Sequence, residues 1–100
     1  METNNEKDFL KMIGVTGTKR ILEFLDQHDK TQYKDLAEFM NTHTLNARLR
    51  ELLRYDLVGH HIIRDEWKKI QWYTITEKGR TVLYLLKSAI AVVQPSFDSD

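Results

Sequence analysis

The chain has 100 residues, enough for one small domain with a single core and too few for two independent cores. Hydrophobic residues make up 41% of the chain and charged residues 30%, and the absence of cysteine excludes disulfides, thiolate metal sites and cysteine nucleophiles. The formal net charge is zero, so the chain as a whole is not a strongly basic nucleic-acid binder.

The charges are unevenly distributed along the chain. Residues 1–42 hold six Lys/Arg and eight Asp/Glu, a net −2, whereas residues 43–80 hold eight and five, a net +3, with three of the four histidines. This asymmetry predicts one basic face, although an imbalance of three charges is also within chance. The chain has no apolar run of 18 residues and a polar N-terminus, so we expect a cytoplasmic, intracellular protein with no membrane partner.

The first part of the chain predicts three helices from the spacing of its apolar residues, over residues 5–13, 18–28 and 33–40. Either Thr16 or Thr18 is expected to cap the start of the second helix. His28 lies near the end of the same helix, where a histidine interacts favourably with the helix dipole.

The segment 41-NTHTLNARLREL-52 predicts a fourth helix that runs to about Tyr55. Asn41 is a favoured N-cap residue and is expected to start it. The leucines recur at helical spacing and predict a buried stripe formed by Leu45, Leu49, Leu52 and Leu53. Only a residue or so separates this helix from the previous one, so the two must turn sharply, as in a helix-turn-helix.

The periodicity of the sequence changes after Asp56. Residues 58–64 and 70–76 are rich in β-branched and aromatic residues and predict two strands. The polar segment 65-DEWKK-69 lies between them. Two strands joined by a short polar turn predict a β-hairpin.

The last helix, predicted over residues 77–93 with Thr76 as its N-cap, is apolar on nearly all sides. A small domain buries only one stripe of such a helix, so the remainder predicts a homodimer. The expected interface combines the first and last helices through Phe9, Leu10, Ile13, Leu83, Leu86, Ile90 and Val93. The alternative is a hydrophobic helix that merely covers the core.

Residues 1–95 are expected to form this single domain, with a core over about residues 16–76. The helix is expected to end before Pro95, and residues 96–100 are expected to be a disordered acidic tail.

Two stretches of the sequence resemble a known family. The run 45-LNARLRELLRYDLV-58, followed by a hairpin and then by 73-YTITEKGR-80, resembles the winged helix-turn-helix regulators of the HxlR and MarR type. Asp56 stands where that family has a turn glycine. The resemblance covers about residues 18–85. It implies an α+β, mainly α fold, a winged helix-turn-helix with a two-stranded wing and N- and C-terminal dimerisation helices.

The resemblance implies double-stranded DNA as the partner. The N-terminal part of the second helix of such a motif reaches base edges, which makes the readout candidates Thr42, His43, Thr44, Asn46 and Ala47. Basic side chains would contact the DNA backbone, and the candidates are Lys34, Arg48, Arg50, Arg54, Arg64, Lys68 and Lys69. The alternative for the arginines is a solvated face with helix salt bridges, such as Arg50 with Glu51 or with Asp56. In the hairpin turn, Asp65 and Glu66 oppose a basic wing, and Trp67 either folds back on the hairpin or stays exposed for a partner.

The sequence predicts no enzyme, because it shows neither a nucleophile–base pair nor a Gly-rich phosphate loop. His60 and His61 are adjacent on a strand and point to opposite faces, so we expect no metal and no other cofactor. Three aromatic residues offer a pocket for a small-molecule effector but are more simply core, namely Tyr84, Tyr73 and Trp72. The existence of an effector is left open.

The expected function is a sequence-specific, double-stranded DNA-binding transcription regulator, in the first place a repressor. It would act as a homodimer on a (pseudo)palindromic site, associated with the nucleoid. The alternative is a winged-helix protein–protein interaction module without DNA binding.

Overall fold

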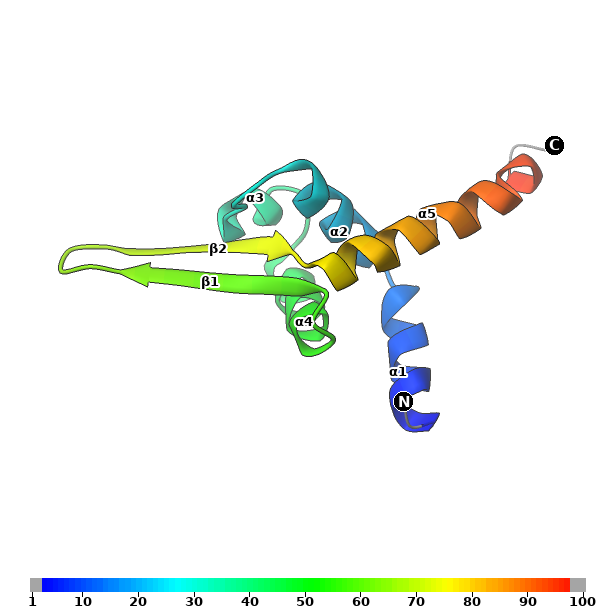
Figure 1. Cartoon of the computed structure of the whole chain (residues 1–100), viewed down its shortest axis with the longest axis horizontal. Coiled ribbons are helices and arrows are strands. Elements are labelled where there is room, and N and C mark those ends of the chain that lie inside the picture. The colour runs from blue at the N-terminus through cyan, green and yellow to red at the C-terminus, as the bar shows by residue number, and fades with distance from the viewer. Residues whose placement is uncertain (1–2, 98–100) are drawn as a thin grey trace.

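The computed structural model describes residues 3–97, with side chains described from residue 5 to residue 94. Five helices and one hairpin follow each other in the predicted order (Figure 1). They are α1 (Thr3–Ile13), α2 (Thr18–Gln27), α3 (Tyr33–Ala37), α4 (Thr42–Arg54), β1 (Val58–Arg64), β2 (Lys69–Ile75) and α5 (Glu77–Phe97). The hairpin projects from one side of the molecule, the far end of α5 projects from the opposite side, and α1 points downward from the body (Figure 1).

One core joins all the helices to the base of the hairpin. The buried apolar side chains are Met12, Ile21, Leu22, Leu25, Leu36, Leu45, Leu49, Leu52, Leu57, Val58, Ile75 and Leu83. The prediction for Leu53 is wrong, because its side chain is 36% exposed. Leu53 lies about 100° further around the helix than Leu52, which takes it to the edge of the buried stripe.

The predicted N-cap is confirmed for α4 but not for α2. Asn41 caps α4 as predicted, since its side-chain oxygen accepts a hydrogen bond from the Thr44 backbone N–H at 2.9 Å. The cap of α2 is Gly17 in the left-handed region (φ 96°), and neither Thr16 nor Thr18 caps the helix. The buried Thr18 hydroxyl instead donates to the Met12 carbonyl at 2.8 Å. Thr18 therefore fastens the end of α1 to the start of α2.

Two helix ends differ from the prediction. Helix α3 ends at Ala37, three residues earlier than expected, because the chain tightens into a turn in which the Phe39 N–H donates to the Leu36 carbonyl at 3.3 Å. Helix α5 ends at Phe97, two residues beyond Pro95. Pro95 has no backbone N–H to donate to the carbonyl four residues earlier, so the last turn of α5 lacks one helical hydrogen bond. Of the predicted tail, residues 98–100 lie outside the described part of the chain.

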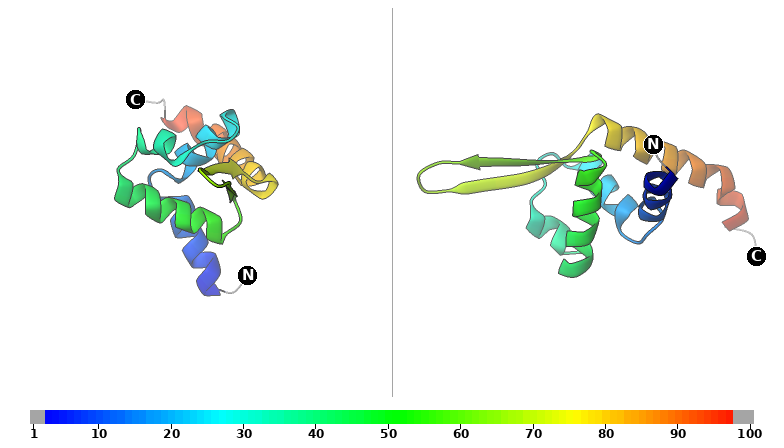
Figure 2. Two further views of the ribbon diagram at one scale, coloured as in Figure 1. Left: turned by 90° about the vertical axis from the view of Figure 1, so that its left-hand side faces the viewer. Right: turned by 90° about the horizontal axis from the view of Figure 1, so that it is seen from below.

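The hairpin pairs antiparallel from Val58 opposite Ile75 to Arg64 opposite Lys69. At its base Thr31 adds a third strand position, exchanging two backbone hydrogen bonds with Tyr73 at 2.7 and 3.1 Å. Seen from below, α4 descends from the hairpin base, so that helix and hairpin form two arms of a corner (Figure 2). The backbone bonds between Thr31 and Tyr73 help to hold the hairpin in its position relative to α4.

The turn after α4 and the start of α5 are bonded to each other. The Thr76 hydroxyl donates to the Asp56 carbonyl at 2.7 Å and accepts from the Gly79 N–H at 2.9 Å, which confirms Thr76 as the N-cap of α5. Gly79 is buried, and a Cβ at this position would meet the Leu57 carbonyl oxygen at 2.1 Å. The glycine of the 73-YTITEKGR-80 motif thus lets α5 approach the backbone that follows α4.

Asp56 adopts a left-handed conformation with φ 60°. This conformation costs roughly 1–2 kcal/mol for most L-residues, less for Asp, and is least tolerated by β-branched side chains. We expect Asp56→Val to lower the free energy of unfolding by about 1–2 kcal/mol. Asp56→Gly is expected to leave it unchanged or slightly raised. Urea unfolding of the two variants checks this, and equal stabilities would contradict it.

Candidate nucleic-acid interface

The first two turns of α4 lie at the molecular surface. The side chains of Thr42, His43 and Asn46 are exposed, and those of Thr44 and Ala47 are half-buried. The five predicted readout residues therefore lie together on one short stretch of helix, beside the α3–α4 turn. Their polar and small side chains could face a partner without disturbing the leucine stripe behind them.

Asn46 is held by a residue that the sequence reasoning missed. The Tyr33 hydroxyl at the start of α3 donates to the Asn46 side-chain oxygen at 2.7 Å. A carbonyl oxygen has two lone pairs, so Asn46 keeps one acceptor position and its two amide donors for another group. Tyr33 and Asn46 are 13 residues apart and meet only through the turn between α3 and α4, so no local pattern predicts their contact. The one available indication was that Tyr33 is the first residue of the helix that precedes α4.

The three arginines of α4 lie on two sides of the helix. Arg48 is only 19% exposed and pairs with Glu51 at 2.6 Å, one turn further along the helix. It lies close to Gly17 in the α1–α2 turn. Arg50 lies about 200° around the helix from Arg48 and is exposed, as is Arg54. The sequence left open a salt bridge of Arg50 with Glu51 or with Asp56. The structure instead pairs Glu51 with Arg48 and Asp56 with Lys78, and the exposed cations of α4 are Arg50 and Arg54.

The other residues predicted to contact the DNA backbone lie on α3 and on the hairpin. Lys34 is exposed on α3, and Arg64, Lys68 and Lys69 are exposed at the far end of the hairpin. The Asp65 carboxylate accepts from the backbone N–H groups of Trp67 and Lys68 at 2.8 and 2.7 Å. This acidic group thus stabilises the turn instead of standing free at the hairpin end.

Aromatic side chains stiffen the base of the hairpin. His60 stacks on Tyr73 with ring centroids 4.6 Å apart, and His61 stacks on Trp72 at 5.4 Å. Burial raises the pKa of the Tyr73 hydroxyl, and the neighbouring Tyr33 raises it further. His60 and His61 interact with different partners on opposite faces, as predicted from their adjacent positions.

The residues predicted at a dimer interface lie in three places: in a groove, further along α5 and in the core. An apolar groove of about 240 Å³ between α1 and α5 contains four of them, and it is lined by Phe9, Leu10, Ile13, Val82, Leu85 and Leu86. Ile90 is half-buried and Val93 is 43% exposed further along α5. Leu83 is only 3% exposed and belongs to the core of the chain itself. The side of α5 that faces the groove, not the side of Leu83, is available to a second chain.

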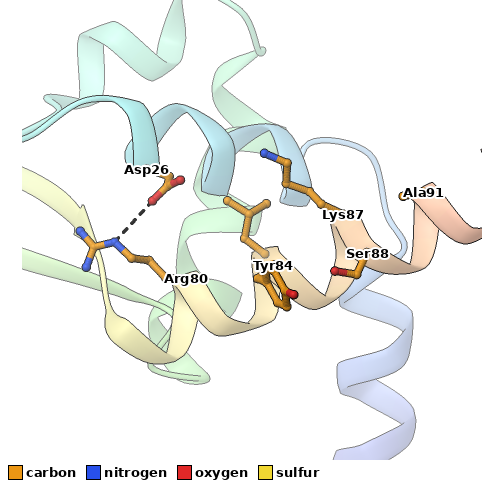
Figure 3. A pocket seen from close by; sticks show the side chains of 7 residues that line it. Asp26, Arg80, Tyr84, Lys87, Ser88 and Ala91 are labelled. Carbon is orange, nitrogen blue, oxygen red and sulfur yellow. Dashed lines mark ion pairs between the residues drawn. The ribbon is translucent and has the colours of Figure 1, made fainter.

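A second cleft lies between α2 and α5 (Figure 3). It measures about 450 Å³, and Arg80 pairs with Asp26 across it at 3.4 Å. Tyr84 lines the cleft and is 70% exposed, whereas Tyr73 and Trp72 lie at the base of the hairpin. The three aromatic residues considered for an effector pocket are therefore not brought together. No residue of α4 or the hairpin lines this cleft.

Within the described part of the chain, no helix is both long and apolar enough to cross a membrane. Residues 3–97 also contain no group of three or more side chains positioned to hold a metal ion.

The sequence matches no protein-family model and no curated protein. Three solved structures have a similar fold. The reduced form of the transcriptional regulator YodB from B. subtilis is 20% identical with a TM-score of 0.74, covering 93% of this chain and 92% of its own. A regulator of the MarR family from Enterococcus faecalis V583 is 21% identical with a TM-score of 0.70, covering 97% and 89%. The third is ytfH from Salmonella typhimurium, described as a transcriptional regulator, 18% identical with a TM-score of 0.67, covering 92% and 86%. The chain has the mainly helical, winged helix-turn-helix fold of these regulators, as its sequence predicted.

Proposed function

We propose that this protein is a transcription regulator that binds double-stranded DNA sequence-specifically as a homodimer. One observation carries the proposal: the exposed first turns of α4 and the exposed basic end of the hairpin form two arms of a corner (Figure 2). A winged helix uses these two elements to contact DNA, with the second helix of the motif in the major groove. The likeness in fold to three transcriptional regulators supports the same reading.

In this proposal the base contacts come from Thr42, His43, Thr44, Asn46 and Ala47. Asn46 would pair with adenine, donating from its amide nitrogen and accepting with the lone pair that Tyr33 leaves free. Because Tyr33 already orients the side chain, less conformational entropy is lost on binding. The Ala47 methyl suits a close approach to the groove and apolar contact with a thymine methyl.

Phosphate contacts would come from exposed cations that border this helix surface. The geometry favours Arg50 most, because Arg48 is paired with Glu51 and lies toward α1. Arg54 is exposed as well, but it lines a cleft beside α1, where its guanidinium lies 5.4 Å from the centre of the Tyr55 ring. Lys34, Arg64, Lys68 and Lys69 extend the basic border to α3 and the hairpin. Such contacts position the protein on the duplex and make its affinity dependent on salt.

Binding at a promoter would act by occupancy, which makes repression the simplest outcome for this domain and places the protein with the nucleoid. The chain has no cysteine, so a thiol switch is not available to it.

The experiment that tests DNA binding is a titration of random duplex DNA at increasing salt. We expect binding at roughly 20–50 mM salt and a steep, linear decrease of log affinity with log salt concentration. Absence of duplex binding at the lowest salt would contradict the proposal and favour a winged-helix module for protein–protein contact. Selection of bound sites from a random pool would then test whether the preferred site is palindromic.

The proposed dimer uses the groove between α1 and α5. Leu10 and Leu85 line this groove with 59% and 58% of their surface exposed, and Val92 and Val93 continue the apolar surface along α5. Contiguous exposed apolar surface of this kind marks an interaction site. A two-fold dimer would present two copies of α4 about one DNA turn apart, roughly 34 Å, as a palindromic site requires.

We expect Leu85→Glu to convert the dimer into a monomer, because a charge would be buried without a partner in the interface. Light scattering should then give about half the mass of the parent protein. Leu85 is exposed within one chain, so the variant should still fold. Ile62→Glu on the hairpin, where Ile62 is 48% exposed, is the matched control and should leave the mass unchanged. A monomeric parent protein would rule out the dimer.

A further inference from the structure

The turn of the hairpin holds its backbone tightly and leaves one large side chain free. Trp67 is 88% exposed. The Asp65 N–H donates to the Lys68 carbonyl at 2.9 Å, and the Asp65 carboxylate accepts from the N–H groups of Trp67 and Lys68. All these bonds use only the backbone at position 67. The turn therefore places the indole at the very end of the hairpin without requiring a tryptophan there.

Trp67 differs in this respect from the other rings of the hairpin. His60, His61, Trp72 and Tyr73 stack in two pairs near the base, and Lys30 lies 5.3 Å from the Trp72 ring. Among the described residues, Trp67 takes part in no aromatic or cation–π contact. Exposure of a large apolar ring to water is unfavourable, so the side chain gains most from a partner that covers it.

The charges around Trp67 indicate the chemistry of that partner. Arg64 and Lys69 lie directly opposite each other on the two strands, and Lys68 is next to Trp67. Like charges in directly opposed positions destabilise a hairpin, and an anion between them would remove this cost. The Asp65 carboxylate is already engaged in the turn. Glu66, on the other side of Trp67, is a carboxylate, but Arg64, Lys68 and Lys69 outnumber Asp65 and Glu66 by three to two. An apolar ring beside these cations fits a polyanion that also offers a flat apolar surface.

The length of the hairpin distinguishes DNA from other polyanions. Seven residues per strand at about 3.3 Å each put the turn about 20 Å from the hairpin base. One turn of DNA measures about 34 Å, so a minor groove lies roughly 17 Å from the neighbouring major groove. A hairpin of this length is therefore long enough to reach the minor groove next to a major groove that holds α4.

We propose that Trp67 inserts into the minor groove as a wedge between two base pairs and gives the protein a preference for flexible steps. The inference rests on the proposed DNA binding. Apolar side chains inserted in this way partly unstack a step and kink the duplex. The deformation costs least at pyrimidine–purine steps such as TA, so Trp67 would select sequence at a position where no base edge is read by hydrogen bonding.

Two measurements test this wedge. Trp72→Phe leaves Trp67 as the only tryptophan while keeping a ring against His61. On addition of duplex we expect the Trp67 emission to shift to the blue, to lose intensity through stacking and to become protected from acrylamide. The second measurement compares an alternating TA duplex with an A-tract duplex of the same composition, which contains no TA step. The parent protein should prefer the alternating duplex.

Trp67→Ala should weaken binding to the alternating duplex about tenfold and remove the preference. The salt dependence should stay the same, because no charge changes. Trp67→Phe should retain most of the preference, which separates a stacking ring from a merely structural residue.

The outcomes separate the wedge from the DNA binding on which it rests. If duplexes bind but Trp67 emission and acrylamide quenching do not change, or if Trp67→Ala binds as tightly as the parent, the wedge is wrong and the proposed function stands. If no duplex binds at low salt, both are wrong. A blue shift with phosphatidylserine vesicles and none with duplex would assign the turn to a lipid surface and overturn the wedge.

Discussion

Replacing both Arg50 and Arg54 by alanine is expected to weaken duplex binding about thirtyfold for each bound protomer at about 0.15 M salt. Each phosphate contact releases condensed counterions and contributes roughly fivefold at this salt concentration. Both side chains are exposed, so their loss should not affect folding. The slope of log affinity against log salt should decrease by about two for each bound protomer. Fluorescence anisotropy of a labelled duplex at several salt concentrations measures both quantities.

Two control variants make this result specific. Lys7→Ala changes the net charge at an exposed position of α1, away from α4, and should alter affinity less than twofold if contacts rather than net charge matter. Arg48→Ala should have a small effect on the salt slope, because Arg48 is paired with Glu51 in the free protein. A double variant that binds with unchanged affinity and slope would show that this face of α4 does not contact DNA.

Gly79→Ala is expected to destabilise the fold by about 3 kcal/mol, a large part of the 5–15 kcal/mol that holds a typical domain together. The added methyl would lie 2.1 Å from the Leu57 carbonyl oxygen and 3.0 Å from its carbonyl carbon. These atoms belong to the backbone and cannot avoid the methyl by a change of rotamer. Relief requires α5 to move away from the turn that follows α4, which also disturbs the base of the hairpin.

Gly14→Ala is the matched control for this prediction. A Cβ at Gly14 would meet its nearest neighbours, the carbonyl oxygens of Leu10 and Lys11, at ordinary distances of 3.6 and 3.9 Å. Thermal and urea unfolding should therefore place Gly14→Ala close to the parent protein and Gly79→Ala well below it. Similar losses in the two variants would mean that the contact between α5 and Leu57 does not limit stability.

The parts of the proposed DNA-binding surface that depend on residues close together in the chain could be predicted from the sequence. Asn41 caps α4 through a hydrogen bond to a residue three positions away, and Thr76 caps α5 in the same manner. The leucine spacing fixes which side of α4 faces the core, so the opposite side was identified correctly as exposed. The alternation of β-branched residues likewise fixed both strands of the hairpin.

Other features depend on which segments meet in space. Arg48 and Arg50 were both predicted to contact phosphates, and the packing of α4 beside the α1–α2 turn gives them different surroundings. The contact between Tyr33 and Asn46 depends on how α3 is positioned against α4. Leu83 and Leu85 are both apolar residues of one helix, and the place where α2 packs on α5 buries one and leaves the other exposed.

By itself, the sequence determined the order of the helices and strands, most of the caps and most of the buried stripe of α4, because hydrogen bonds and periodicity act between residues close together in the chain. The tertiary structure decided the direction of each arginine, the exposed side of α5 and the free indole of Trp67 at the end of the hairpin. The physical reason is that the exposure of a side chain depends on its neighbours in space, and these come from segments that the local pattern of the sequence does not place.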